Sequence, residues 1–197
     1  MKTLIINGSP KINGDTSSLI DEFTKHLIGE VRILSCYSHI SPCRDCRYCW
    51  SHSGCSIDDE MQEIYPFLEQ CDNVVLASPI WFSSLSGPLL NIASRMQTLY
   101  AGRCFRHESF EAEKNGVLIL VGAEKGTEVM PEKTALVILK HMHVRRPCTA
   151  AVYSMDTNNI PAREDENAMS SVREAAELLN HLYNQSHTKR ISEEESP

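Results

Sequence analysis

Five short apolar runs alternate along the chain with stretches whose apolar residues recur at helical spacing. The runs are apolar throughout, not only at every second position, which is typical of parallel strands buried on both faces of a sheet. The stretches between them predict amphipathic helices that cover this sheet. The predicted strands are residues 3–6, 31–34, 73–77, 117–121 and 149–153.

A helix is predicted after each of these strands. Pro88 and Pro131 suit the first turns of two helices, because proline lacks the N–H that an interior helical position needs. A polar, basic loop is expected over residues 101–115, before the fourth strand. The predicted helices carry residues 19–28, 58–69, 88–100 and 131–141, and a last one carries residues 169–183.

This alternation predicts an α/β fold with a doubly wound, five-stranded parallel sheet, helices on both faces and the strand order 2-1-3-4-5. The ligand crevice of such a sheet lies at the carboxyl ends of strands 1 and 3, where the order reverses. No repeat or long linker divides the chain. We therefore expect one domain over residues 1–184 and a polar, acidic, mobile tail over residues 185–197.

Composition narrows the class of protein. The chain has 197 residues, of which 42% are hydrophobic, enough for one domain with a sizeable core. A net charge of -7 gives no support to a general nucleic-acid-binding surface. No apolar segment approaches the length of a membrane span, and Met1 leads directly into the first strand without a signal-peptide pattern. A cytoplasmic protein is expected.

The loop after the first strand carries the strongest chemical signal. It reads N-G-S-P-K-I-N-G-D-T-S-S from Asn7 to Ser18 and leads into a helix. Free backbone N–H groups, hydroxyls and the positive end of a helix dipole converge there, which indicates an anion site, most naturally for a phosphate. The spacing matches neither the ATPase P-loop nor the dinucleotide motif. The alternative is an ordinary strand–turn–helix connection with Asp15 as the N-cap.

The loop after the third strand, Ser78 to Ser84, carries Trp81 and Phe82 at its tip. Beside a phosphate loop, an aromatic and hydroxyl-rich loop suits a phosphorylated flat ring. The alternative is that the two aromatic residues belong to a dimer interface or to the core.

Together these loops resemble a known family. G-S-P-K-x-x-G-D-T-S-S is similar to the G-S-P-R-x-x-G-N-T loop of NAD(P)H-dependent FMN reductases with the flavodoxin-like fold. S-P-I-W-F-S-S-L-S-G-P-L-L-N-I-A-S-R-M resembles the segment that follows their third strand. Asp15 replaces the usual Asn, and Asn91 and Ser94 replace the usual Lys and Asp around Arg95. The match covers residues 1–96 well and the remainder only in layout.

The resemblance implies where FMN binds. Ser9, Lys11, Thr16, Ser17 and Ser18 would surround its phosphate. Residues of the loop after the third strand would border the ribityl chain and the ring. The turn after the fourth strand would approach the far edge of the ring. These further residues are Pro79, Ile80, Trp81, Phe82, Ser83, Gly122 and Glu124.

Four of the eight cysteines crowd into one segment, P-C-x2-C-x2-C-x5-C, which comprises Cys43, Cys46, Cys49 and Cys55. The segment resembles the compact motif of iron–sulfur flavoproteins, a branch of the same family. Its short spacings suit a 4Fe-4S cluster, whereas zinc sites more often pair two knuckles across a long gap. A cluster, reduced thiols and zinc all remain open from spacing alone. A cluster is expected at the crevice end of the second strand.

The family implies a cytoplasmic oxidoreductase in which NAD(P)H delivers a hydride to FMN and electrons pass to a quinone, a flavin or a similar acceptor. The flavin would carry the chemistry, so no catalytic side chain is predicted. The alternative is a non-enzymatic electron carrier that holds FMN and a 4Fe-4S cluster. The apolar helix from Pro88 to Tyr100 beside an aromatic loop predicts a homodimer.

Overall fold

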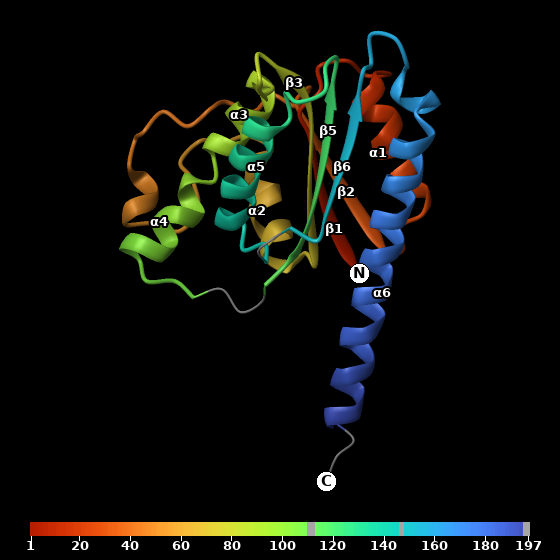
Figure 1. The fold of residues 1–197 in the computed structure, drawn as a ribbon. Helices are drawn as coiled ribbons and strands as arrows, with labels where there is room; N and C mark the ends of the chain where they lie inside the picture. Colours follow the sequence, from red (N-terminus) through yellow and green to blue (C-terminus); the bar gives the residue numbers. More distant parts are fainter. Residues whose placement is uncertain (110–112, 146–147, 195–197) are drawn as a thin grey trace.

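The computed structural model describes residues 1–109, 113–145 and 148–194. Its centre is a parallel sheet in the order β2-β1-β3-β5-β6 (Figure 1). The predicted α/β class and the predicted order of the five parallel strands are therefore confirmed. The strands are β1 (Lys2–Asn7), β2 (Glu30–Ser35), β3 (Asn73–Trp81), β5 (Asn115–Gly122) and β6 (Ala150–Met155).

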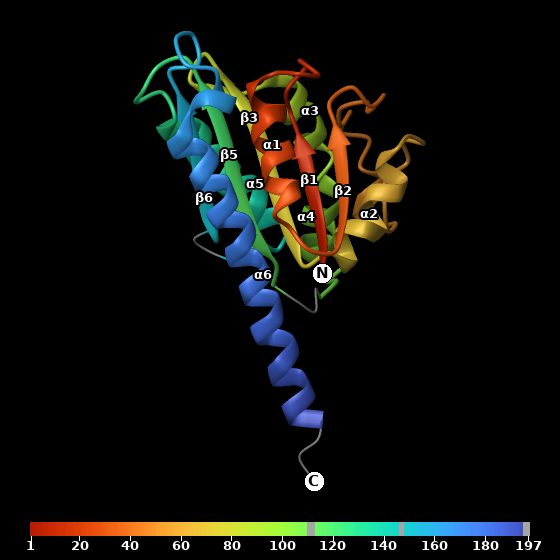
Figure 2. The same cartoon turned by 90° about the vertical axis from the view of Figure 1, so that its right-hand side faces the viewer.

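The sheet separates two hydrophobic cores, as its uninterrupted apolar strands require. Along β1, the side chains of Leu4 and Ile6 enter one core and that of Ile5 enters the other, because successive residues of a strand face opposite ways. Helices α1 (Asp15–Lys25) and α6 (Glu166–Glu194) cover one face. The opposite face is covered by α2 (Met61–Gln70), α3 (Gly87–Ser94), α4 (Gln97–Phe105) and α5 (Val129–His141) (Figure 2).

Several predicted boundaries are wrong. The helix expected over residues 88–100 is broken between α3 and α4, and α4 occupies the start of the loop expected over residues 101–115. Residues 110–112 of that loop lie outside the described part of the chain. A short strand, β4 (Ser84–Leu85), pairs antiparallel with the end of β3 and was not predicted.

The last helix also differs from the prediction, because α6 continues to Glu194 and projects beyond the sheet (Figure 1). The expected domain boundary at residue 185 thus falls inside a helix. Residues 195–197 of the expected tail lie outside the described residues.

Candidate functional site

A cleft of about 340 Å³ lies at the carboxyl ends of β1, β3 and β5, the edge at which the strand order predicts a ligand site. It brings together the three loops that carry the predicted flavin residues. The predicted residues that line it are Ser9, Lys11, Thr16, Pro79, Ile80, Trp81 and Gly122.

A close backbone crossing fixes the loop after β1. The Gly8 N–H donates to Ala77 O at 2.8 Å, and the Ser86 hydroxyl donates to Gly8 O at 2.7 Å. A Cβ on Gly8 would lie 2.5 Å from Leu89 Cβ, so the loop can approach α3 this closely only because residue 8 is glycine. The loop is thereby held between β3 and the start of α3.

Helix α1 points its N-terminus into the cleft. Its first helical hydrogen bond runs from Ser18 N–H to Gly14 O at 3.0 Å, so the N–H groups of residues 15–17 have no partner within the helix. The hydroxyls of Ser17 and Ser18 donate to Lys11 O and Gly14 O and brace the loop from within. Thr16 is buried, lines the cleft and has no side-chain hydrogen bond to any described residue. Its hydroxyl is therefore available to a ligand.

The carboxylate of Asp15 has a structural partner. Gly14, not Asp15, is the N-cap of α1. The Oδ1 atom of Asp15 accepts a 2.8 Å hydrogen bond from the Ala162 N–H, at the start of the short helix η2 (Ala162–Glu164) that follows β6. Asp15 thus ties the start of α1 to η2, and the interpretation of Asp15 as the N-cap of its own helix is wrong.

The aromatic loop is a tight β3–β4 hairpin. Trp81, at the end of β3, lines the cleft and is 41% exposed. Phe82 and Ser83 occupy the two central positions with φ of 52° and 53°, a left-handed backbone that is uncommon for phenylalanine. Phe82 is fully exposed at the tip, and neither Phe82 nor Ser83 lines the cleft. The strained turn presents Trp81 to the ligand space and Phe82 to solvent.

The turn after β5 closes the cleft opposite the hairpin. Gly122 is buried, while Glu124 is exposed and does not line the cleft. The Gly122 carbonyl accepts hydrogen bonds from the Asp156 and Thr157 N–H groups and from the Thr157 hydroxyl, at 2.9 Å, 3.1 Å and 3.1 Å. Thr157 also lines the cleft and was not predicted, although its place after the last parallel strand was the signal that could have identified it.

The four clustered cysteines line a second, small cavity together with Arg95 and Thr98. All four are free thiols in the structure. Within the described residues, no group of three or more His, Cys, Asp or Glu side chains stands ready to ligate a single metal ion. The thiols therefore share one cavity without forming a closed ligand set, and their chemistry suits soft ligands such as iron–sulfur clusters.

This segment lies apart from the cleft. The backbone N–H of Cys43 donates to Ser94 of α3, and the segment then forms the short helix η1 (Tyr48–Trp50) against α4 (Figure 1). The ring of Trp50 stacks on that of Phe105, with the ring centroids 4.4 Å apart. No residue in the described part of the chain lines both cavities. The expectation that the cysteines lie at the crevice end of the second strand is therefore wrong: the chain leaves the sheet edge before the first of them.

The thiols differ in their electrostatic surroundings. A contact with the Ser56 hydroxyl and the backbone N–H of Tyr48 lower the pKa of Cys46. Burial raises the pKa of Cys49, and the neighbouring thiols of Cys43 and Cys55 raise it further. The Cys49 thiol is thus close enough to Cys43 and Cys55 to be affected by their charge.

The sheet order, with a cleft at its switch point, is that of the flavodoxin-like fold. Residues 1–154 match the family described as NADPH-dependent FMN reductase, and the chain belongs to that family. The resemblance predicted from the two loop motifs is therefore confirmed.

Two relatives and one solved structure show the range of similarity. An iron–sulfur flavoprotein of Methanocaldococcus jannaschii is 29% identical over 129 residues, which cover 64% of this chain and 64% of the relative. One of Methanosarcina thermophila is 26% identical over 190 residues, 91% of this chain and 93% of the relative. The NAD(P)H:quinone oxidoreductase from Methanothermobacter marburgensis aligns with a TM-score of 0.66 at 16% identity and covers 90% and 96% of the two chains.

Among the described residues, no helix is both long and apolar enough to span a bilayer.

Proposed function

We propose that the protein binds FMN in the cleft after β1, β3 and β5, takes a hydride from NAD(P)H and passes electrons to a small acceptor such as a quinone or a flavin. The observation that carries this proposal is the hydroxyl of Thr16, unpaired among the described residues, beside the N-terminus of α1, in a cleft whose other wall is Trp81. A hydroxyl beside a helix N-terminus suits a phosphate, and the indole of Trp81 suits a flat ring.

The cleft residues fit FMN by their chemistry. Thr16, Ser9 and the free N–H groups of α1 would hold the phosphate, with Lys11 adding positive charge from the exposed side. Pro79, Ile80 and Trp81 would border the ring on one side, and Gly122 would leave room on the other. FMN, when bound, supplies hydride acceptance and onward electron transfer; the protein supplies binding and orientation.

We further propose that Cys43, Cys46, Cys49 and Cys55 ligate a 4Fe-4S cluster. Their position on a single cavity supports this proposal, and so do the names of the two curated relatives. Such a cluster, when bound, supplies one-electron transfer and complements the two-electron chemistry of a nicotinamide.

Anaerobic purification followed by flavin, iron and sulfide analysis tests both sites. We expect FMN in the wild-type protein, about four irons per chain from four cysteine ligands, and loss of the iron but not of the FMN in Cys46→Ser. FMN without iron would exclude the cluster and leave the flavin site standing. A preparation that neither contains nor binds FMN would exclude the flavin site.

A second candidate function is that of an electron carrier that needs a partner reductase. The separate cysteine cavity favours it, because a second redox site suits a relay. Steady-state oxidation of NAD(P)H with a quinone distinguishes the two functions: the enzyme turns over alone, whereas a carrier requires another protein.

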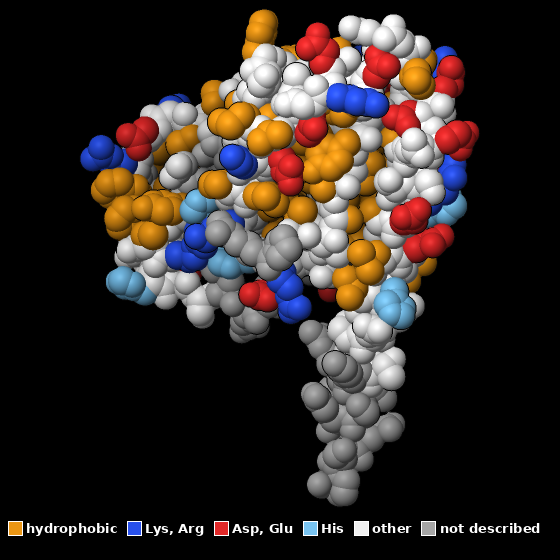
Figure 3. Space-filling view, in the orientation of Figure 1, with side chains coloured by type: hydrophobic (Ala, Val, Ile, Leu, Met, Phe, Trp, Pro, Cys, Tyr) orange, Lys and Arg blue, Asp and Glu red, His pale blue; other side chains and the backbone are white. Residues whose placement is uncertain are grey.

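We also propose a homodimer. Figure 3 shows hydrophobic side chains gathered over η1, α4 and α5, which include the exposed residues Trp50, Tyr100, Phe105 and Val137. A groove of about 390 Å³ between α3, α4 and α5 is lined by Leu90, Met96 and Ile138, among others. A second copy would cover this apolar surface. Sedimentation at micromolar concentration should give about twice the chain mass of 22.2 kDa, and a monomer would contradict the proposal.

A further inference from the structure

Arg95 is a buried arginine beside the cysteine cavity. It is the C-cap residue of α3, at the break before α4, and its side chain has no exposed surface. Its Nη1 atom lies 2.5 Å from Asp59 Oδ2, whose side chain is only 8% exposed. Burial opposes both charges, but their mutual contact keeps the pKa of Asp59 below its ordinary value and that of Arg95 above it. The pair is therefore ionised inside the protein.

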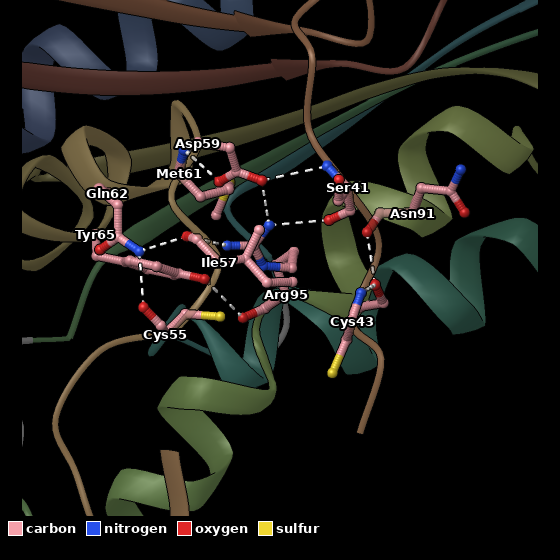
Figure 4. Close-up of polar contacts among 11 residues, drawn as sticks. Ser41, Cys43, Cys55, Ile57, Asp59, Met61, Gln62, Tyr65, Asn91 and Arg95 are labelled. Atoms are coloured by element: carbon pink, nitrogen blue, oxygen red, sulfur yellow. Dashed lines mark hydrogen bonds and ion pairs between the residues drawn. The ribbon is translucent and has the colours of Figure 1, made fainter. Parts of the chain in front are cut away.

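The Arg95 guanidinium joins the two ends of the cysteine segment. Nη1 also donates to Ser41 O at 2.9 Å, before the first cysteine, and Nη2 donates to Ile57 O at 3.5 Å, after the last (Figure 4). Asp59 reinforces the junction, because its Oδ2 accepts a 3.2 Å hydrogen bond from the Ser41 N–H. One ion pair thus closes a loop that contains all four cysteines.

Neighbouring side chains extend this anchorage to the cysteines themselves. The Ser94 hydroxyl oxygen accepts a 2.9 Å hydrogen bond from the Cys43 N–H, and Gln62 Nε2 donates to Cys55 O at 2.8 Å (Figure 4). The Tyr65 hydroxyl donates to the backbone carbonyl of Arg95 at 3.2 Å and holds the arginine in turn. The first and last cysteines are therefore fixed by residues of α2 and α3.

One nitrogen of the Arg95 guanidinium has no hydrogen-bond partner among the described residues. Its Nε is buried and makes no hydrogen bond within the described structure, and Arg95 itself lines the cysteine cavity. A buried guanidinium N–H without a partner is costly unless an acceptor is supplied. Arg44 and Arg47 are also near but exposed, so solvent weakens their influence far more than that of Arg95.

We propose that Arg95 is the positioning residue of the cysteine site: it holds both ends of the segment in place and sets a buried positive charge beside whatever the thiols ligate. The electrostatic role rests on the proposed cluster, whereas the positioning role does not. A neutral residue at position 95 should loosen the segment and, with a cluster bound, make the cluster harder to reduce. Loss of the Asp59 charge should have the opposite effect on reduction, because it leaves the arginine less neutralised.

The test compares Arg95→Gln, Arg95→Lys and Asp59→Asn with the control Arg173→Gln. The control removes an arginine from the ion pair that joins α6 to Glu22 on α1, on the other face of the sheet. Two quantities are measured. Hydrogen–deuterium exchange of residues 41–59 is recorded in iron-free protein, and the cluster midpoint potential is followed by electron paramagnetic resonance in anaerobic, iron-loaded protein.

We expect Arg95→Gln to exchange at least tenfold faster over residues 41–59 and to shift the oxidised-to-reduced ratio at a fixed potential by at least tenfold toward oxidised, which is about 59 mV for a one-electron couple. Asp59→Asn should shift the ratio the other way, Arg95→Lys should retain most of the wild-type potential, and the control should change neither quantity. Shifts of the same sign in Arg95→Gln and Asp59→Asn would overturn the electrostatic role.

The exchange measurement separates this inference from the proposed function. If the wild-type protein purifies anaerobically without iron, the cluster is excluded. If Arg95→Gln nevertheless exchanges faster than wild type over residues 41–59, the positioning role is supported. Unchanged exchange in Arg95→Gln would overturn the positioning role whether or not iron is present. If Arg95→Gln does not fold, exchange is compared in Arg95→Lys, whose single ammonium cannot reach all three acceptors and should loosen the segment in the same sense.

Discussion

The substitution Thr16→Val tests the phosphate site at its most specific atom. Valine keeps the β-branched shape of threonine and removes only the hydroxyl. Because this hydroxyl has no hydrogen bond to the described protein, its removal breaks no internal hydrogen bond, and the fold should be retained. A ligand phosphate, in contrast, would lose a hydrogen bond that a charged acceptor makes strong.

A hydrogen bond to a charged group contributes about 1.5–3 kcal/mol. At about 1.4 kcal/mol for each factor of ten, FMN should bind roughly ten- to hundredfold more weakly to Thr16→Val than to the wild-type protein. Riboflavin lacks the phosphate, so its affinity should be nearly unchanged. The difference between the two ligands is therefore the quantity to measure.

Flavin fluorescence titration of apoprotein with FMN and with riboflavin provides the assay. Thr24→Val is the matched control, since Thr24 lies on the same helix and its hydroxyl donates to Asp21 O at 3.0 Å, away from the cleft. Equal losses of FMN and riboflavin in Thr16→Val, or an equal loss of FMN in the control, would refute the assignment.

Four further predictions concern stability and turnover. Asp59→Ala should lower the free energy of unfolding by about 3–5 kcal/mol in urea denaturation, because it leaves the Arg95 charge buried and unpaired; a loss below about 1 kcal/mol would show that the pair is not effectively buried. The pKa of Asp59 lies below its ordinary value of 3.8, so its ionised form stabilises the fold above that pH. The difference in free energy of unfolding between wild type and Asp59→Asn should therefore shrink as the pH falls below 3.8. A difference that stays constant would contradict the pairing. Trp81→Ala should slow flavin reduction in stopped-flow measurements, because Trp81 lines the cleft. The melting temperature should change little, because Trp81 is 41% exposed. A large drop in melting temperature with unchanged kinetics would make Trp81 a core residue. Gly8→Ala should lower the free energy of unfolding by about 1–3 kcal/mol, because the new Cβ would lie 2.5 Å from Leu89 Cβ. Unchanged thermal unfolding would show that the backbone crossing at Gly8 is not tight.

The sheet was predictable because its signal is local. Each buried strand is a run of apolar residues, and the polar residues that follow β1 and β3 had to meet at one edge once the strands were taken as parallel. The N-terminal half of the cleft followed from that rule. Thr157 follows from the same rule applied to β6, although its loop carries no motif.

The cysteine site was not predictable in the same way. Arg95 sits within an apolar stretch that suggests one continuous helix, but its side chain turns inward to Asp59, 36 residues earlier in the chain. Spacing within a helix cannot reveal a partner at that distance, so both the helix break and the anchorage of the cysteines were missed. The segment itself has no apolar periodicity, and its position was therefore inferred wrongly from the strand that precedes it.

Anaerobic addition of NADPH or NADH to the purified, FMN-loaded protein tests most directly the proposal that this chain is a nicotinamide-dependent FMN oxidoreductase. We expect one of the two nicotinamide nucleotides to bleach the flavin absorption band within seconds of mixing in a stopped-flow experiment. A quinone added afterwards should restore the band. A band that stays unchanged with an excess of either nicotinamide would contradict the claim.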